Sequence, residues 1–410
     1  MKAVFKPSRL SGTIRAPQSK SIAIRLLFSS LLGKISLKGL EHSDDVEAAI
    51  RAIRALGVNR SKDSFERSEL PDELGSVDLG GSGTVLRILL PILACSGVSA
   101  SLTGDHTLQK RPLGVLQEVL ASSGVEMTGD HLPLRISGRL NTREVTISGS
   151  QSSQYISGFI FGLLLVGGGK ISLLPPVRSS SYIQMTCDVL NSLGAQIRYS
   201  GNEIRIAPVD RVLEYSGPVP GDFLLSSFYA AGAILTGGEL KITDLSHPEW
   251  SMGDSRIAGI MNRCSGKGRV SGSCWEVQSA ESILSFRENV EDSPDMAVSL
   301  AALAAGSTSE SEISGVELLG IKESDRLISI ADTLVNYGCT VGTDGVMTIR
   351  GTDRPEKGAT GIWNDHRIAM LGSVLSMRAG GTVNGAESVS KSNPRFFDDL
   401  RKLGGDFQLI

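Results

Sequence analysis

The sequence predicts an α/β (α+β) fold built from six copies of one helix-and-strand unit, three in each of two domains. Three observations support this. A glycine-terminated helix signature recurs along the chain, a more apolar helix recurs with the same period, and a Pro- and Gly-rich segment separates the third copy from the fourth. Glycine accounts for 47 of 410 residues and aromatic residues for 5%, which is typical of many short elements joined by tight turns.

The first recurring feature is an apolar residue four positions before a glycine, with Ser265 in the glycine position of the fourth copy. A glycine just past a helix end adopts the left-handed conformation that closes the helix. Successive copies are 67, 70, 71, 73 and 66 residues apart, and this near-constant spacing indicates a repeat. The six copies are residues 53–57, 120–124, 190–194, 261–265, 334–338 and 400–404.

The second recurring feature is a more apolar helix, and we interpret each copy as followed by glycine and a short alternating strand. Each unit therefore contains a helix, a strand, a second helix and two further strands. Doubly wound sheets and barrels alternate strand and helix in units of about 30 residues, so the longer period disfavours both. The six predicted apolar helices are residues 19–32, 82–94, 152–166, 224–235, 295–305 and 364–378.

The segment SGPVPGD at residues 216–222 disfavours both helix and central strand, so it predicts a linker between the third and fourth units. A second crossing is expected near Ala16 and Pro17, because the N-terminal strand belongs with one domain and the first helix with the other. We predict one domain at residues 18–220 and a discontinuous second domain at residues 1–17 and 221–410. Two hinges at one interface imply a clamshell.

Composition limits the function classes. The net charge of −3 lacks the basic excess usual in nucleic-acid-binding proteins. The five cysteines are scattered singly, without a CxxC pair or a histidine at ligand spacing, so neither a disulfide framework nor a zinc site is expected. No signal peptide or membrane span is recognisable. We expect a cytoplasmic protein without metal or organic cofactor and without nucleic-acid or membrane partners.

Charged and hydroxyl-bearing residues gather where the apolar helices begin. Free backbone N–H groups and the positive end of the helix dipole lie there, so these positions favour an anionic ligand. Cations at a helix start oppose the dipole, and therefore something anionic should compensate them. The cations at these positions are Lys20, Arg25, Arg87 and Arg367.

Each of these features also has a structural interpretation. Ser19, Ser82, Ser152 and Asn364 could simply be N-caps. GGSGT at residues 80–84 could be a tight turn, and it lacks the Gly-Lys-Ser/Thr sequence of a P-loop, which disfavours ATP-dependent phosphoryl transfer. IKESDRL at residues 321–327 could be a solvated helix face.

Together, however, the motifs resemble the enolpyruvyl transferase family, and within it the branch that acts on 3-phosphoshikimate. The resemblance covers nearly the whole chain and implies two domains, each of three βαβαββ repeats whose helix N-termini converge on the interdomain cleft. The motifs that carry it are QSKSIAIR, LGGSGTVLR, KRPL, SSQYISG, SSSYIQMT, SPDMA, IKESDRL, WNDHRIAM and KSNPRFFDDL.

The resemblance implies two small-molecule substrates, phosphoenolpyruvate and 3-phosphoshikimate, no cofactor, and a role in making chorismate and the aromatic amino acids. We expect a monomer that glyphosate inhibits, since Gly83 stands where a larger side chain would crowd that inhibitor. By motif position the phosphoenolpyruvate-binding residues are Lys20, Gly83, Arg111, Gln154, Arg326, Arg367 and Lys391. The residues that the resemblance implies for binding 3-phosphoshikimate are Lys20, Ser21, Arg25, Ser152, Ser153, Gln154, Ser179, Tyr182, Asp295 and Lys322.

The resemblance also implies the catalytic groups. Asp295 is expected to act on the 5-hydroxyl of the shikimate and Glu323 in proton transfer at C3, with Lys20 and Lys391 as assisting acids. A carboxylate among cations should have a lowered pKa, which favours its ionised form.

Two alternatives remain open. Enolpyruvyl transfer to UDP-N-acetylglucosamine is disfavoured, because that relative has Lys-Asn where this chain has Lys20 and Ser21, and a catalytic cysteine on a loop corresponding to residues 105–112, which contain none here. A non-catalytic clamshell that binds an anionic metabolite would explain the cations equally well, although it would need neither Asp295 nor Glu323.

Overall fold

The computed structural model describes residues 1–121, 123–150, 152–245, 247, 250, 254–265 and 267–410. The chain forms two compact units. Unit 1 comprises Met1–Ser19, Pro220–His247 and Met252–Ile410, and unit 2 comprises Lys20–Val219 and Pro248–Ser251. Gln18 therefore lies in unit 1 rather than in the domain predicted to begin there, because it pairs with Gly221 in an isolated antiparallel bridge and Ser19 N donates to Pro220 O at 2.9 Å. The hinged movement of a clamshell remains a prediction.

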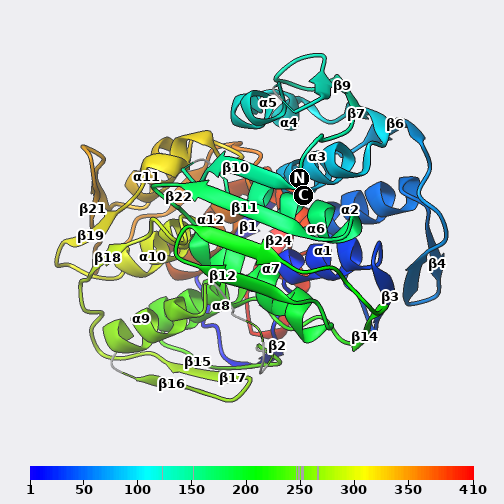
Figure 1. Cartoon of the computed structure of the whole chain (residues 1–410). Coiled ribbons are helices and arrows are strands. Elements are labelled where there is room, and N and C mark those ends of the chain that lie inside the picture. The colour runs from blue at the N-terminus through cyan, green and yellow to red at the C-terminus, as the bar shows by residue number, and fades with distance from the viewer. Residues whose placement is uncertain (122, 151, 246, 248–249, 251–253, 266) are drawn as a thin grey trace. The chain divides into compact units, whose positions relative to one another are not determined.

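Unit 2 contains the first three repeats (Figure 1). Its last strand, β14, pairs in parallel with β3 and so completes the sheet of the first repeat. The first repeat consists of α1 (Lys20–Ser29), β3 (Gly33–Leu37), α2 (Asp44–Ala55), β4 (Val58–Ser61), β5 (Ser64–Arg67) and β14 (Leu213–Gly217). The second consists of β6 (Glu73–Asp78), α3 (Gly83–Ser96), β7 (Ser99–Thr103), α4 (His106–Gln109), α5 (Gly114–Ala121), β8 (Val125–Met127) and β9 (Leu134–Gly138). The third consists of β10 (Glu144–Ser148), α6 (Ser153–Leu165), β11 (Gly169–Leu174), α7 (Ser180–Ser192), β12 (Ile197–Ser200) and β13 (Glu203–Ile206).

Unit 1 contains the other three repeats, and the N-terminal segment supplies a strand to two of them. The fourth repeat consists of β2 (Gly12–Arg15), α8 (Phe223–Leu235), β15 (Glu239–Thr243), α9 (Arg256–Ser265), β16 (Gly268–Ser271) and β17 (Cys274–Gln278). The fifth consists of β18 (Arg287–Asn289), α10 (Met296–Ala304), β19 (Ser311–Ser314), η1 (Glu317–Ile321), α11 (Arg326–Val335), β20 (Thr340–Gly342) and β21 (Met347–Arg350). The sixth consists of β22 (Gly358–Thr360), α12 (His366–Ala379), β23 (Gly381–Asn384), η2 (Ala386–Lys391), α13 (Phe396–Lys402), β24 (Phe407–Leu409) and β1 (Lys2–Phe5).

The chain ends meet within unit 1. Strand β1 lies between β23 and β24 and is antiparallel to both. Lys2 and Ile410 exchange two backbone hydrogen bonds of 2.8 Å each, so the two termini lie side by side (Figure 1).

The described residues form six sheets of four strands each, all with the same topology, which confirms the repeat. In each, an edge strand runs parallel to its neighbour, that neighbour is antiparallel to the third strand, and the third is antiparallel to the fourth. The glycines predicted to close the second helices have left-handed φ values, for example 85° at Gly57 and 84° at Gly338. The fourth copy differs, because Ser265 is the last helical residue of α9 rather than the residue past its end.

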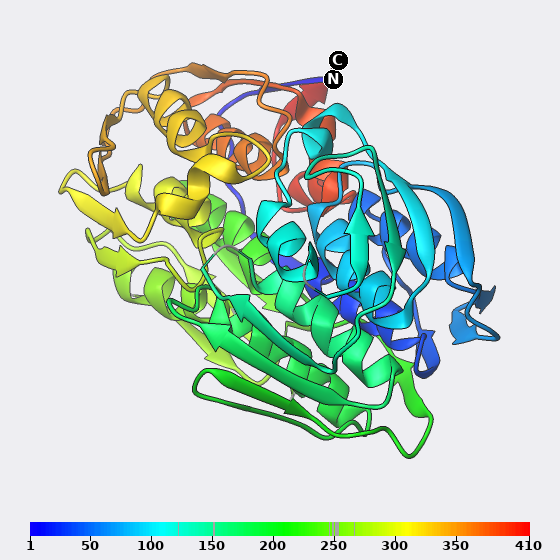
Figure 2. The same ribbon diagram turned by 45° about the horizontal axis from the view of Figure 1, so that its top comes forward.

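The apolar helices form the cores of both units because residues on almost every side of them are buried. In unit 2, α3 and α6 pack closely along one another (Figure 2). Two glycines of α6 permit this approach: a Cβ at Gly158 would lie 2.6 Å from the carbonyl oxygen of Ile88, and one at Gly162 would lie 2.7 Å from Sγ of Cys95. No helix in the described part of the chain has the length and apolar character needed to cross a membrane.

We expect Gly158→Ala to lower the free energy of unfolding by about 1–3 kcal/mol, because its methyl group would force α3 away from α6. Urea unfolding at neutral pH measures this change. Gly114→Ala is the matched control, since Gly114 is also helical but its Cβ would meet no atom within 4 Å. Equal stability of the two variants would contradict the close-packing argument.

Candidate active site

The charged motif residues of unit 1 form one connected cluster, which we call the carboxylate cluster. It consists of Asp295, Lys322, Glu323, Arg326, Asp365, Arg367 and Lys391. These side chains come from the start of α10, the segment that runs from the end of η1 into the first residue of α11, the start of α12 and the last residue of η2. Four segments distant in sequence therefore bring cations and carboxylates together.

Arg326 is the centre of the carboxylate cluster. Its Nη1 lies 2.6 Å from Asp295 Oδ1 and its Nη2 lies 2.7 Å from Glu323 Oε2. Its Nε lies 2.8 Å from Asp365 Oδ2. The side chain is 1% exposed, which contradicts the interpretation of IKESDRL as a solvated helix face. Burial disfavours the charged form, but the three carboxylates outweigh this and raise the pKa of Arg326.

Both carboxylate oxygens of Asp295 contact cations. Oδ1 lies 3.2 Å from Lys322 Nζ in addition to its contact with Arg326, and Oδ2 lies 3.3 Å from Arg367 Nη2. Burial favours the protonated acid, but Lys322, Arg326 and Arg367 together hold the pKa of Asp295 well below its usual value. Asp295 is therefore ionised at neutral pH.

Arg367 and Lys391 complete the positive side of the cluster. In the described part of the chain, Nε and Nη1 of Arg367 are buried and have no hydrogen-bond partner. Lys391 Nζ lies 3.7 Å from Glu323 Oε1. A guanidinium with two unused donors is suited to an oxyanion, because its planar fork matches carboxylate and phosphate oxygens.

Asp365 was not among the residues that the sequence assigned, although it lies within the WNDHRIAM motif. It is the N-cap of α12 and accepts the backbone N–H of Arg367 at 3.0 Å. Asn364, the predicted N-cap, instead precedes it with a left-handed φ of 52°. Asp365 thus caps the helix and orients Arg326 with one carboxylate, a double role that local sequence does not reveal.

A second group of motif residues lies in unit 2, at the starts of α1, α3 and α6. Lys20 Nζ lies 2.7 Å from Asp45 Oδ2. Gln154 accepts from Arg87 Nη1 at 3.2 Å and donates from Nε2 to Thr84 Oγ1 at 2.9 Å, which connects α6 to α3. Ser82 and Ser152 are N-caps, as their structural interpretation predicted.

Gly83 begins α3 directly beside Arg111. A Cβ at Gly83 would lie 2.6 Å from Arg111 Nη1 and 3.5 Å from Arg87 Nη1. Only a residue without a side chain fits this position while Arg111 stays where it is. The structure therefore brings Gly83, Arg87 and Arg111 together at one helix start.

Arg25 is almost completely buried, and its guanidinium donates hydrogen bonds to other parts of unit 2. It donates from Nε to Thr186 Oγ1 at 2.8 Å, and to the backbone oxygens of Ser21 and Tyr182 at 2.7 and 3.1 Å. Burial, partly offset by the charges of Tyr182 and Cys187, lowers its pKa to about 10. Arg25 thus connects α1 to α7, which carries the SSSYIQMT motif and whose N-cap Ser179 has a left-handed φ of 55°. Ser153 is buried at the first position of α6.

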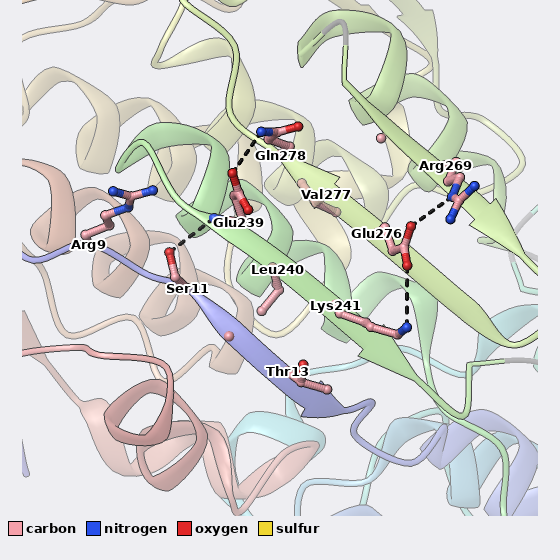
Figure 3. A pocket seen from close by; sticks show the side chains of 12 residues that line it. Arg9, Ser11, Thr13, Glu239, Leu240, Lys241, Arg269, Glu276, Val277 and Gln278 are labelled. Carbon is pink, nitrogen blue, oxygen red and sulfur yellow. Dashed lines mark hydrogen bonds and ion pairs between the residues drawn. The ribbon is translucent and has the colours of Figure 1, made fainter.

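A hollow of about 910 Å³ lies elsewhere in unit 1, on the sheet formed by β2, β15, β17 and β16 (Figure 3). Glu276 there pairs with Lys241 at 3.5 Å and with Arg269 at 2.8 Å. These cations are exposed, and such ion pairs contribute little energy. The residues that line the hollow include none of the motif residues, so we do not assign it to the substrates.

Solved structures with this architecture include enolpyruvyl transferases. EPSP synthase from Acinetobacter baumannii superposes with a TM-score of 0.78 at 21% identity, covering 100% of this chain and 99% of that one. The enolpyruvyl transferase NikO from Streptomyces tendae gives 0.72 at 18% identity, covering 99% and 98%. At these identities the similarity establishes the class of fold.

Sequence comparison then establishes the family. The family model described as EPSP synthase (3-phosphoshikimate 1-carboxyvinyltransferase) matches residues 4–400, and the chain belongs to this family. The 3-phosphoshikimate 1-carboxyvinyltransferase of Sulfurisphaera tokodaii is 42% identical over 401 residues, covering 98% of both chains. That of Saccharolobus solfataricus is 39% identical over 412 residues with the same coverage.

We expect Asp295→Asn to reduce stability at neutral pH by about 1–3 kcal/mol, because three cations lose their shared carboxylate. The carboxyl titrates near pH 3.9 in an unfolded chain. Since its folded pKa is lower, its ionisation stabilises the fold above about pH 4, and this contribution is lost as the pH falls further. Urea unfolding between about pH 7 and pH 3 should show the difference between wild type and variant shrinking in acid.

Asp344→Asn, at an exposed carboxylate, is the control and should change little. A difference between wild type and Asp295→Asn that stays constant down to about pH 3 would show that the pKa of Asp295 is not lowered by folding.

Proposed function

We propose how the site residues divide the work of the family reaction, which this enzyme carries out: transfer of the enolpyruvyl group of phosphoenolpyruvate to the 5-hydroxyl of shikimate 3-phosphate. The observation that carries the proposal is Asp295, an ionised carboxylate whose two oxygens are both held by cations. A protein that only binds anions would not need a proton-accepting carboxylate in that position, where it also repels the ligand.

In the proposed addition step, Asp295 takes the proton of the 5-hydroxyl while the hydroxyl oxygen bonds to C2 of phosphoenolpyruvate. C3 gains a proton at the same time, and Glu323 is the proposed group for this transfer, assisted by Lys391, whose Nζ lies 3.7 Å from it, and by Lys20. The product is a tetrahedral intermediate. In the proposed elimination step the C2–O bond to phosphate breaks, C3 returns a proton to Glu323, and the departing phosphate takes the proton held by Asp295, which leaves the enolpyruvyl ether and inorganic phosphate.

Both substrates are anions, so cations must offset their mutual repulsion. We assign phosphoenolpyruvate to Lys20, Arg111, Arg326, Arg367 and Lys391, with Gly83 and Gln154 beside them. We assign shikimate 3-phosphate to Ser21, Arg25, Ser152, Ser153, Ser179, Tyr182 and Lys322.

The cations that hold Asp295 are the same ones that the proposal assigns to the substrates: Lys322 to shikimate 3-phosphate, and Arg326 and Arg367 to phosphoenolpyruvate. A carboxylate with a strongly lowered pKa is a weak base. Substrate charges that share these cations would weaken their hold on Asp295 and raise its basicity when the hydroxyl is in place. This competition explains how one carboxylate can be stable before binding and reactive afterwards.

The direct test is phosphate release from phosphoenolpyruvate in the presence of shikimate 3-phosphate, run beside UDP-N-acetylglucosamine. We expect phosphate release when shikimate 3-phosphate is the acceptor and none when UDP-N-acetylglucosamine is. In Asp295→Ala the rate of release should fall about a hundredfold or more, because the proton acceptor is removed. Asp344→Ala is the matched control. Full activity of Asp295→Ala would refute its role, and tight binding of the shikimate without phosphate release would favour the non-catalytic clamshell.

Gly83→Ala should raise the KM for phosphoenolpyruvate by about tenfold or more and reduce inhibition by glyphosate, because the new methyl group displaces Arg111. The KM for shikimate 3-phosphate should change less. Steady-state kinetics in both substrates measure this, with Gly75→Ala as control, because a Cβ there meets nothing within 4 Å. An unchanged KM for phosphoenolpyruvate would remove Gly83 and Arg111 from its binding site.

A further inference from the structure

The partner of Lys20 is a carboxylate to which neither the repeat pattern nor the motifs assigned a role. Asp45 is the second residue of α2, which follows the N-cap Ser43. The Lys20 and Asp45 side chains are 14% and 4% exposed, and 2.7 Å separates Lys20 Nζ from Asp45 Oδ2. The pair joins two helix starts that are 25 residues apart in sequence.

The two helix starts have opposite electrostatic requirements. The dipole of α1 opposes the Lys20 cation at its first residue, whereas the dipole of α2 favours the Asp45 anion in its first turn. Helix α2 therefore stabilises the carboxylate, and the carboxylate in turn compensates the lysine. A cation at a helix start needs a nearby anion, and for Lys20 the protein itself supplies that anion as Asp45.

Among the described residues, the Asp45 side chain has few contacts besides Lys20. Its Oδ1 is buried and has no hydrogen-bond partner there, and the ion pair with Lys20 is its described side-chain contact. A buried carboxylate is costly unless it is paired. A half-satisfied buried carboxylate is poorly explained as a device for stability alone.

We propose that Asp45 is a positioning residue for enolpyruvyl transfer, which holds the ammonium group of Lys20 in one place so that its remaining N–H bonds meet the phosphoenolpyruvate. This inference rests on the role proposed above for Lys20. An ammonium group has three N–H donors, and Asp45 takes one of them. The cations of the carboxylate cluster follow the same rule, since each of Lys322, Arg326, Arg367 and Lys391 also contacts a carboxylate.

A double-mutant cycle tests the proposal: Asp45→Asn, Lys20→Met and the double variant, each assayed for phosphate release. We expect Asp45→Asn to lower kcat about tenfold to a hundredfold, because a displaced catalytic group costs rates of this order. In the Lys20→Met background the same substitution should have little further effect on kcat. Glu47→Gln is the control: it removes a charge from the same turn of α2, but its contact is with the exposed His42.

Thermal unfolding of every variant separates positioning from folding, and Asp45→Ser takes the place of Asp45→Asn if the amide variant does not fold. Wild-type kcat in Asp45→Asn, with Lys20→Met inactive, would overturn this inference alone. So would an equal loss of kcat on removing Asp45 with and without Lys20, because that is the behaviour of a purely structural residue. Wild-type kcat in Lys20→Met would overturn the role of Lys20 and the inference with it.

Discussion

The guanidinium of Arg326 is the point on which the arrangement of the carboxylate cluster depends. It binds Asp295, Glu323 and Asp365, which come from three separate segments of unit 1. A buried cation needs partners, and the three carboxylates would repel one another without it. Burial of Arg326 thus fixes where the proposed base and the proposed proton-transfer group stand, and through Asp365 it also fixes the start of α12.

This mutual compensation resolves a conflict between stability and function. A site for two anionic substrates must collect cations, yet cations at helix starts oppose the helix dipoles and repel one another. Carboxylates of the protein occupy the cations in the described structure: Asp295 contacts three of them, Glu323 two, and Asp45 one. In the proposed reaction the substrates take over part of that role, which turns a stabilising carboxylate into a usable base.

The repeat supplies the helix starts from which this site is built. Each sheet begins with a strand that leads into an apolar helix, and in three of the six repeats one strand comes from a distant part of the chain: β1, β2 or β14. Strand β14 follows the third repeat in the sequence but completes the sheet of the first repeat. Strands β1 and β2 precede the first repeat in the sequence but complete the sheets of the sixth and fourth repeats in unit 1. Six short units that could not bury their apolar helices alone are in this way joined into two cores.

The sequence by itself determined the repeat, its period and the boundaries of the six apolar helices to within a few residues, because periodic apolar positions and closing glycines are local signals. It also determined the family and most of the proposed site residues, because their motifs are contiguous. Only the tertiary structure decided which carboxylate meets which cation. Asp45 and Lys20 are 25 residues apart in sequence, and Asp365 and Arg326 are 39 apart. From the local sequence, an acidic residue at a helix start indicates only an N-cap or a favourable interaction with the helix dipole. Their second role exists only because the packing of the helices brings distant helix starts within hydrogen-bond distance.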